Sequence, residues 1–82
     1  MDIKDETCAI IARELGIDPA GLTGDQYFRS LPNVDSMRVL QIIVKTEKAF
    51  DIEIDDDVTF KIQTIGEFQS LVAKLVQQRA AA

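Results

Sequence analysis

Residues 35–50 read DSMRVLQIIVKTEKAF, and the rest of the fold can be worked out from this stretch. Between Ser36 and Phe50 there is no Gly and no Pro, and apolar residues recur near the 3.6-residue period of an α-helix. These apolar positions are Met37, Leu40, Ile43, Val44 and Phe50. The stretch therefore predicts an amphipathic helix over residues 36–50.

Asp35 and Ser36 stand where this helix is expected to begin. Asp35 suits the N-cap, because its carboxylate can accept hydrogen bonds from the free amides of the first turn. Ser36 then occupies about the first helical position, at the positive end of the helix dipole, where phosphate is favoured. Asp and Ser are also the ordinary residues of helix starts, so the local sequence alone favours a simple cap pair over a functional serine.

Two more helices are predicted, one on each side of this stretch. Residues 2–15 carry an apolar stripe and are followed by Gly16, a typical C-cap. Residues 64–67 fit the S/T-x-x-E capping box and open a final helix that is expected to end near residue 78. Residues 79–82 are expected to form a disordered tail.

A long connection over residues 16–34 joins the first two helices, and Gly and Pro punctuate it. Asp18 and Pro19 are suited to open one short helical turn, because Pro fits the first helical position. Loops of this length are usually anchored or functional. The side chains expected to anchor this loop are Leu22, Tyr27, Phe28 and Leu31.

Residues 51–57 hold five carboxylates and no basic residue. A calcium loop of the EF-hand type is excluded, because Asp56 and Ile62 stand where that loop needs Gly and Glu. The stretch is interpreted as a solvated acidic loop in which Ile52 and Ile54 point inward. Its second half favours a short helix at about residues 56–61, since carboxylates stabilise a helix N-terminus.

Composition excludes several classes of function. A net charge of −5 over 82 residues argues against a nucleic-acid partner, and the length indicates one domain. The chain has no His and one Cys, so the commonest general base and a zinc site are both missing, and neither catalytic nor metal-ligating residues are expected. No membrane span or signal peptide is visible, so we expect a cytoplasmic protein without a membrane partner.

Four features in this order resemble the acyl carrier protein family. They are the run Asp35-Ser36-Met37, the helix that ends at Phe50, the acidic exit Asp51-Ile52-Glu53-Ile54, and the restart Thr64-Ile65-Gly66-Glu67-Phe68. The resemblance covers about residues 35–76, whereas the first helix and loop agree in layout only. It implies an all-α four-helix bundle with three longer helices, a short third helix and a long first loop. The carrier domain would span residues 1–78.

The resemblance also implies a function. Ser36 would be esterified to 4′-phosphopantetheine by a phosphopantetheinyl transferase, with Asp35 near the magnesium ion of that reaction. The arm would hold acyl groups as thioesters for acyl-activating or acyl-transfer enzymes of fatty-acid, polyketide or related specialised biosynthesis, on a monomeric carrier that is not itself an enzyme. Partner-facing residues would be Met37, Arg38, Leu40 and Val44, and the residues lining an acyl cavity would be Ile54, Ile62 and Phe68.

The sequence departs from the family pattern in two ways. Asn33 stands where a glycine is common, two positions before Asp35. The second helix, usually acidic in the family, here carries Arg38, Lys45 and Lys48 against one carboxylate, Glu47. Enzymes of fatty-acid synthesis that read an acidic second helix are therefore expected to bind this chain poorly, and we expect a specialised stand-alone carrier.

Two alternatives stay open at this point. The cargo would be an amino acid or peptide in an aminoacyl or peptidyl carrier, which the sequence does not separate from an acyl carrier. In an unmodified helical interaction domain, Met37, Leu40 and Val44 would anchor a partner helix, although plain core packing explains such a stripe equally well for Leu40.

Overall fold

The computed structural model describes residues 2–59 and 61–81, and every regular element in that part of the chain is a helix. The α-helices are α1 (Ile3–Leu15), α2 (Ser36–Phe50), α3 (Asp56–Thr59) and α4 (Ile65–Ala81), and two 3₁₀ turns are η1 (Pro19–Gly21) and η2 (Phe28–Ser30). The predicted all-α class is confirmed, with three longer helices, a short third helix and a long first loop. The short turn expected at Asp18-Pro19 is η1, and η2 was not predicted.

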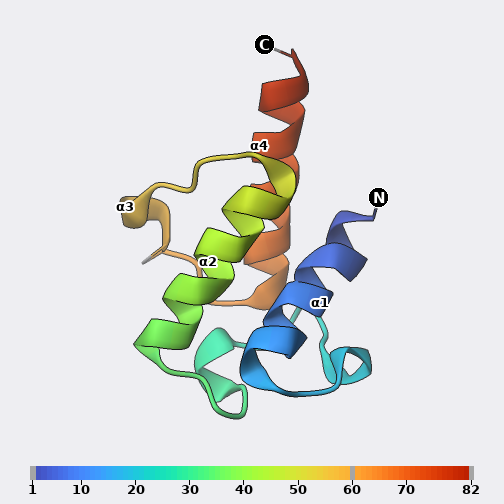
Figure 1. The fold of residues 1–82 in the computed structure, drawn as a ribbon, viewed down its shortest axis with the longest axis vertical. Coiled ribbons are helices and arrows are strands. Elements are labelled where there is room, and N and C mark those ends of the chain that lie inside the picture. The colour runs from blue at the N-terminus through green and yellow to red at the C-terminus, as the bar shows by residue number, and fades with distance from the viewer. Residues whose placement is uncertain (1, 60, 82) are drawn as a thin grey trace.

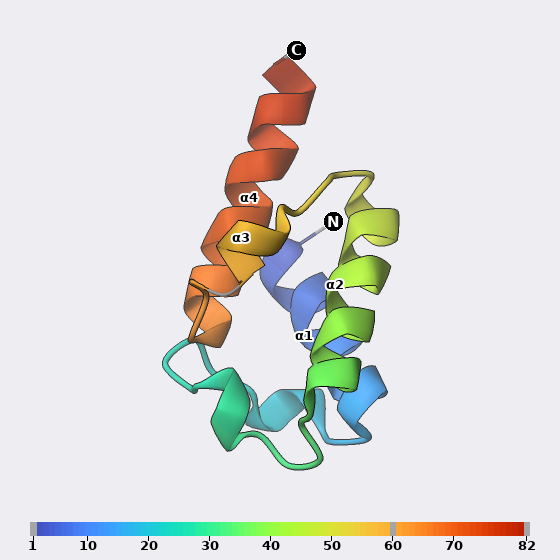
Figure 2. The same cartoon turned by 90° about the vertical axis from the view of Figure 1, so that its left-hand side faces the viewer.

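The three longer helices form a bundle in which α1 packs against both α2 and α4 (Figure 1). The short helix α3 lies on the left of α2 in Figure 1, and the view turned by 90° shows that the long loop that carries η1 and η2 covers the lower end of the bundle (Figure 2). The last turns of α4 project beyond the other helices in both views. No helix among residues 2–59 and 61–81 is long and apolar enough to cross a membrane.

The first helix begins and ends as its sequence predicts. The Asp2 carboxylate accepts from the Lys4 amide at 2.9 Å, and Gly16 adopts a left-handed φ of 69° while its N–H donates to the Ala12 carbonyl. Thr7 lies fully buried on the inner face of α1, and its hydroxyl donates to the Ile3 carbonyl at 2.7 Å. Satisfying the hydroxyl within the helix removes most of the cost of burying it.

The core lies where the three long helices meet. Phe68 of α4 is 2% exposed, and the ring of Phe28 from η2 meets it edge to face, with the centroids 5.6 Å apart. Ile52 and Ile54 of the acidic loop are buried in the same core, as predicted. The loop is therefore anchored by two apolar side chains while its carboxylates Glu53 and Asp55 remain exposed.

The buried face of α2 differs from the predicted stripe. Ile42, Ile43 and Thr46 are buried, whereas Met37 is 67% exposed and Leu40 is 51% exposed. The predicted stripe left out Ile42 and Thr46. Thr46 can be buried because its hydroxyl donates to the Ile42 carbonyl at 2.7 Å. Core packing is accordingly the wrong explanation for Leu40.

The long loop is fastened to the start of α4 by backbone hydrogen bonds. The Phe28 amide donates to the Gln63 carbonyl at 2.9 Å, and the Gly66 amide donates to the Gly24 carbonyl at 2.8 Å. Tyr27 pairs with Thr64 in an isolated antiparallel bridge, but its side chain is 49% exposed. The prediction that the Tyr27 side chain anchors the loop is therefore wrong, because the backbone makes the contact there. Leu31 is buried, and Leu22 and Phe28 are partly buried, as expected.

The capping box that opens α4 is confirmed. The Glu67 amide donates to the Thr64 hydroxyl, and the Thr64 amide donates to the Glu67 carboxylate, both at 3.1 Å. The helix continues to Ala81 instead of ending near residue 78, since alanine is the strongest helix former. The disorder expected over residues 79–82 stays a prediction for the last turn, and Ala82 lies outside the described residues. Of the short helix expected at 56–61, the structure describes α3 over Asp56–Thr59, and residue 60 lies outside the described residues.

Candidate functional site

Ser36 is the first residue of α2 and is exposed to solvent. Asp35 before it is extended, and its carboxylate oxygen Oδ1 accepts from the Arg38 amide at 2.8 Å, so Asp35 is the N-cap that the sequence predicted. The Ser36 hydroxyl therefore lies at the positive end of a 15-residue helix, where a phosphate group is stabilised by about 0.3–1 kcal/mol.

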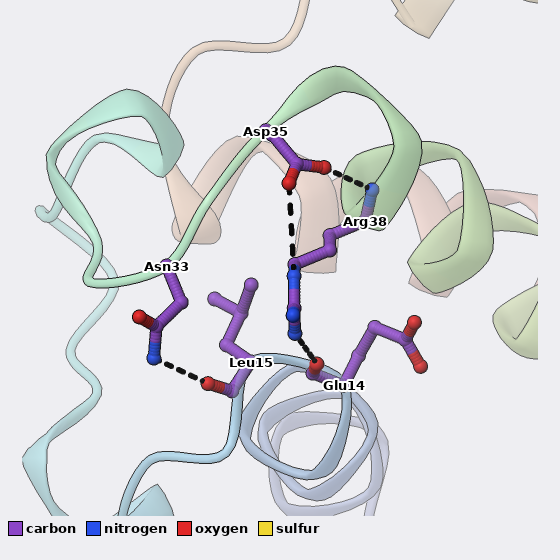
Figure 3. Close-up of polar contacts among 5 residues, drawn as sticks. All are labelled: Glu14, Leu15, Asn33, Asp35 and Arg38. Carbon is purple, nitrogen blue, oxygen red and sulfur yellow. Dashed lines mark hydrogen bonds and ion pairs between the residues drawn. The ribbon is translucent and has the colours of Figure 1, made fainter.

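Two side chains fix this helix start against the end of α1 (Figure 3). The Arg38 guanidinium donates to the backbone carbonyl of Glu14 at 2.8 Å. The side-chain amide of Asn33 donates to the backbone carbonyl of Leu15 at 2.9 Å. The last carbonyls of a helix have no partner within that helix, so side chains that reach them stabilise its end. Ser36 thus lies between two residues that are each tied to the same neighbouring helix.

Asn33 adopts a left-handed backbone conformation with φ of 65°. Among non-glycine residues Asn enters this region most readily. This explains how Asn33 can stand where a glycine is common in the family that the sequence resembles. Its amide also gains the hydrogen bond to Leu15, which a glycine could not make.

A groove of about 730 Å³ opens directly beside Ser36, between α2, the end of α3 and the turn η2. Polar groups lie along it at Arg29, Asp35, Thr59 and Gln63. The apolar residues that line it are Phe28, Val34, Val39, Leu40, Ile43 and Ile62. An open, mainly apolar groove of this kind can shelter a flexible apolar group attached at the helix start.

The predicted cavity residues fall in two places. Ile62 lines the groove, whereas Ile54 is 7% exposed and Phe68 is 2% exposed within the closed core. Val39 and Ile43 also line the groove, and neither was among the predicted cavity residues. Their spacing of three and seven residues from Ser36 places them on the same side of the helix as the serine, and this signal was available in the sequence.

The predicted partner-facing residues are exposed along α2. Met37, Arg38 and Leu40 are exposed, and Val44 is half-buried. Lys45 and Lys48 follow on the same helix and are also exposed. The site therefore combines an accessible hydroxyl, an apolar groove on one side and a cationic helix surface on the other.

The acidic loop is held by local contacts. Asp51 adopts a left-handed conformation at the end of α2, with φ of 56°, and its carboxylate pairs with the guanidinium of Arg79. Among the described side chains, no group of three or more His, Cys, Asp or Glu is arranged to hold a metal ion. Cys8 lies on α1, and burial raises the pKa of its thiol.

Comparison with known proteins agrees with this geometry. Residues 5–72 match the family described as "Phosphopantetheine attachment site". An acyl carrier protein of Picosynechococcus sp. is 33% identical over 73 residues, which is 89% of this chain and 90% of the relative. An acyl carrier protein of Chlamydia trachomatis serovar D is 32% identical over 79 residues, covering 96% of this chain and 97% of the relative.

The solved structures include a similar fold. A candidate acyl carrier protein from Mycobacterium tuberculosis superposes with a TM-score of 0.81 at 30% identity, covering 88% of this chain and 96% of that one. The similarity therefore extends over sequence and fold together, and it includes both the loop before Ser36 and the helices around the groove.

Proposed function

This chain belongs to the acyl carrier protein family, and we propose that Ser36 is the residue to which its 4′-phosphopantetheine is attached. Proteins of this family are carriers rather than enzymes, and this chain is accordingly a carrier. The observation that supports Ser36 is its place: an exposed hydroxyl at the N-terminus of α2, after a loop and beside an apolar groove. A hydroxyl that another enzyme modifies has to be exposed in this way.

The residues around Ser36 fit the attached group. The helix dipole favours its phosphate, and Asp35 next to the serine is exposed, so its carboxylate can approach the magnesium ion of the phosphopantetheinyl transferase. When bound, the arm supplies a thiol that carries the cargo as a thioester. The chain itself then only has to present the arm and protect what it carries.

We propose that the cargo is an acyl group, delivered to acyl-activating and acyl-transfer enzymes of fatty-acid, polyketide or related specialised biosynthesis. The groove supports an acyl over an aminoacyl cargo, because Val39, Ile43 and Ile62 offer an apolar wall and no described carboxylate faces an amino group there except Asp35. The monomeric state and the cytoplasmic location expected from the sequence stay predictions.

Mass spectrometry tests the attachment site. The chain should gain the mass of one phosphopantetheine when it is coexpressed with a broad-specificity phosphopantetheinyl transferase, and Ser36→Ala should not. Ser70→Ala removes another exposed serine, on α4, and should leave the modification intact. An unmodified wild-type chain would count against the carrier function, and a modification that survives Ser36→Ala would place the arm elsewhere.

A further inference from the structure

The exposed side of α2 carries cations and no carboxylate of the helix itself. We call the exposed residues Met37, Arg38, Leu40, Gln41, Lys45 and Lys48 the cationic face of α2. Glu47, the helix's one carboxylate, is partly buried, and its Oε2 accepts from the Ile54 amide at 2.8 Å. The Glu47 carboxylate therefore contacts the acidic loop and does not contribute to the cationic face.

A second carboxylate is covered in a similar way. Glu14 of α1 lies 2.5 Å from the Lys45 ammonium, but the Glu14 side chain is only 16% exposed while that of Lys45 is 48% exposed. An approaching protein consequently meets Lys45 before it meets Glu14. Asp35 is the exception, because it remains exposed beside Arg38 at the start of the helix.

From this arrangement we propose that the cationic face of α2 docks on a partner protein whose surface presents acidic side chains around an apolar socket for Met37 and Leu40. This inference rests on the proposed function, because docking here would bring the group on Ser36 to the partner's active site. Complementary charge mainly accelerates the encounter and selects among partners. An exposed methionine and leucine between the cations favour a protein partner over a polyanion, which needs no apolar contact.

The rest of the surface fixes the direction of docking. Glu53, Asp55 and Asp57 are exposed just beyond the C-terminal end of α2, so a partner with an acidic surface is repelled there. The same partner is attracted by Lys45 and Lys48 and is thereby held along α2. The net charge of −5 likewise disfavours a nucleic acid or an anionic membrane as the occupant.

A charge-changing variant tests this inference. The double variant Gln41→Glu/Lys48→Glu leaves two cations and adds two carboxylates, so it cancels the positive charge of the face without touching Arg38 or Lys45, which contact Glu14. The first probe, the original enzyme, is a fatty-acid-synthesis enzyme that binds carriers through an acidic second helix. The second probe, the reversed enzyme, is the same protein with the basic residues of its docking patch changed to Glu. Dissociation constants are measured by fluorescence anisotropy on the unmodified chain, so the result does not depend on whether Ser36 accepts an arm.

We expect the wild-type chain to bind the reversed enzyme at least about tenfold more tightly than the original enzyme, and the double variant to lose this preference. The wild-type difference should shrink as salt is added. The matched control Lys74→Glu/Gln77→Glu makes the same change of charge at exposed positions of α4 and should keep the wild-type preference.

The inference is overturned if the wild-type chain prefers the original enzyme, binds both forms equally or binds neither. It is also overturned if the α4 control loses the preference as completely as the α2 variant, since net charge alone would then explain the result. Tighter binding to vesicles of anionic lipid than to the reversed enzyme would replace the protein partner by a membrane. None of these outcomes affects the test of Ser36 by mass spectrometry.

Discussion

The Arg38 guanidinium donates to the backbone carbonyl of Glu14 at 2.8 Å, so a side chain in the first turn of α2 caps a carbonyl in the last turn of α1 (Figure 3). The family resemblance suggested only a partner-facing role for Arg38. The hydrogen bond adds a structural role, because it satisfies a helix-end carbonyl that has no partner within α1.

We expect Arg38→Glu to lower the free energy of unfolding by about 1–2 kcal/mol, because it removes a hydrogen bond from a charged but partly exposed donor. Lys48→Glu makes the same change of charge on the same helix, and we expect it to stay within about 0.5 kcal/mol of wild type. Urea unfolding followed by circular dichroism compares the two. Equal midpoints for both variants would show that the Arg38–Glu14 contact contributes nothing.

Asp35→Asn should separate the two roles of Asp35. Asn caps a helix about as well as Asp, so the free energy of unfolding should change by less than about 0.5 kcal/mol. Loss of the carboxylate should slow modification by the transferase by about 10–100-fold, the usual cost of removing a group beside a catalytic metal. Initial rates of modification measure this effect. A wild-type rate for Asp35→Asn would mean that Asp35 serves only as the cap.

Gly66→Ala should destabilise the protein by about 1–3 kcal/mol, because the added Cβ has to be accommodated against backbone. That Cβ would lie 2.9 Å from the Gly24 carbonyl oxygen, and the hydrogen bond from Gly66 to Gly24 leaves little room for adjustment. Gly21→Ala is the control, since a Cβ there meets nothing within 4 Å. Thermal unfolding should rank Gly66→Ala well below Gly21→Ala, and similar melting temperatures would contradict the close approach.

Phe50→Ala should lower the free energy of unfolding by about 1–3 kcal/mol. A fully buried Phe would cost about 3–5 kcal/mol, but the Phe50 side chain is only partly buried. Phe68 is 2% exposed, so Phe68→Ala should lower the free energy of unfolding by about 3–5 kcal/mol, as for other buried aromatic residues. Urea melts of the two variants give the ranking, and a smaller loss for Phe68→Ala would reverse our view of the core.

The Cys8 thiol should react slowly with iodoacetamide in the folded chain. Burial is the main cause that raises the pKa of Cys8 above its ordinary value of 9.0. A hydrogen bond from Gln69 lowers this pKa, whereas the nearby carboxylates of Asp5 and Asp2 raise it. The fold therefore favours the neutral thiol. This contribution to stability is fully present below about pH 9 and is lost as the pH rises through the raised pKa.

Alkylation followed by mass spectrometry checks this on the unmodified chain, in which Cys8 is the one cysteine. At the same mildly alkaline pH the folded chain should react more slowly than the chain unfolded in urea. Equal rates in the two states would show that the thiol is neither protected nor shifted.

The parts of the fold that local sequence determines could be predicted. Asp35 correctly predicted the start of α2, and the pair Thr64 and Glu67 correctly predicted the start of α4. Both predictions were possible because a cap acts within one turn of its own helix. Ile52 and Ile54 were placed inward correctly from their alternation with carboxylates. Ser36 could be singled out only because a family resemblance gave its position a meaning that the cap pair alone did not.

Contacts between distant residues could not be predicted. Arg38 and Glu14 are 24 residues apart, and the approach of Gly24 to Gly66 depends on how the loop crosses the bundle. The buried side of α2 was misjudged because the predicted stripe left out Ile42 and Thr46, and the burial of Thr46 depends on a hydrogen bond from its hydroxyl to the Ile42 carbonyl that a count of apolar residues does not register. Tyr27 was misjudged because its backbone, and not its ring, makes the contact.

The ties from Asn33 and Arg38 to α1 have one more consequence. They hold the helix start that carries Ser36, the proposed attachment point, against the body of the molecule, so movement of a tethered cargo would have to come from the tether's own rotatable bonds. The distance over which cargo can be transferred between enzymes would then depend on the length of the tether. Each docked enzyme would meet the start of the tether at the same position relative to α2.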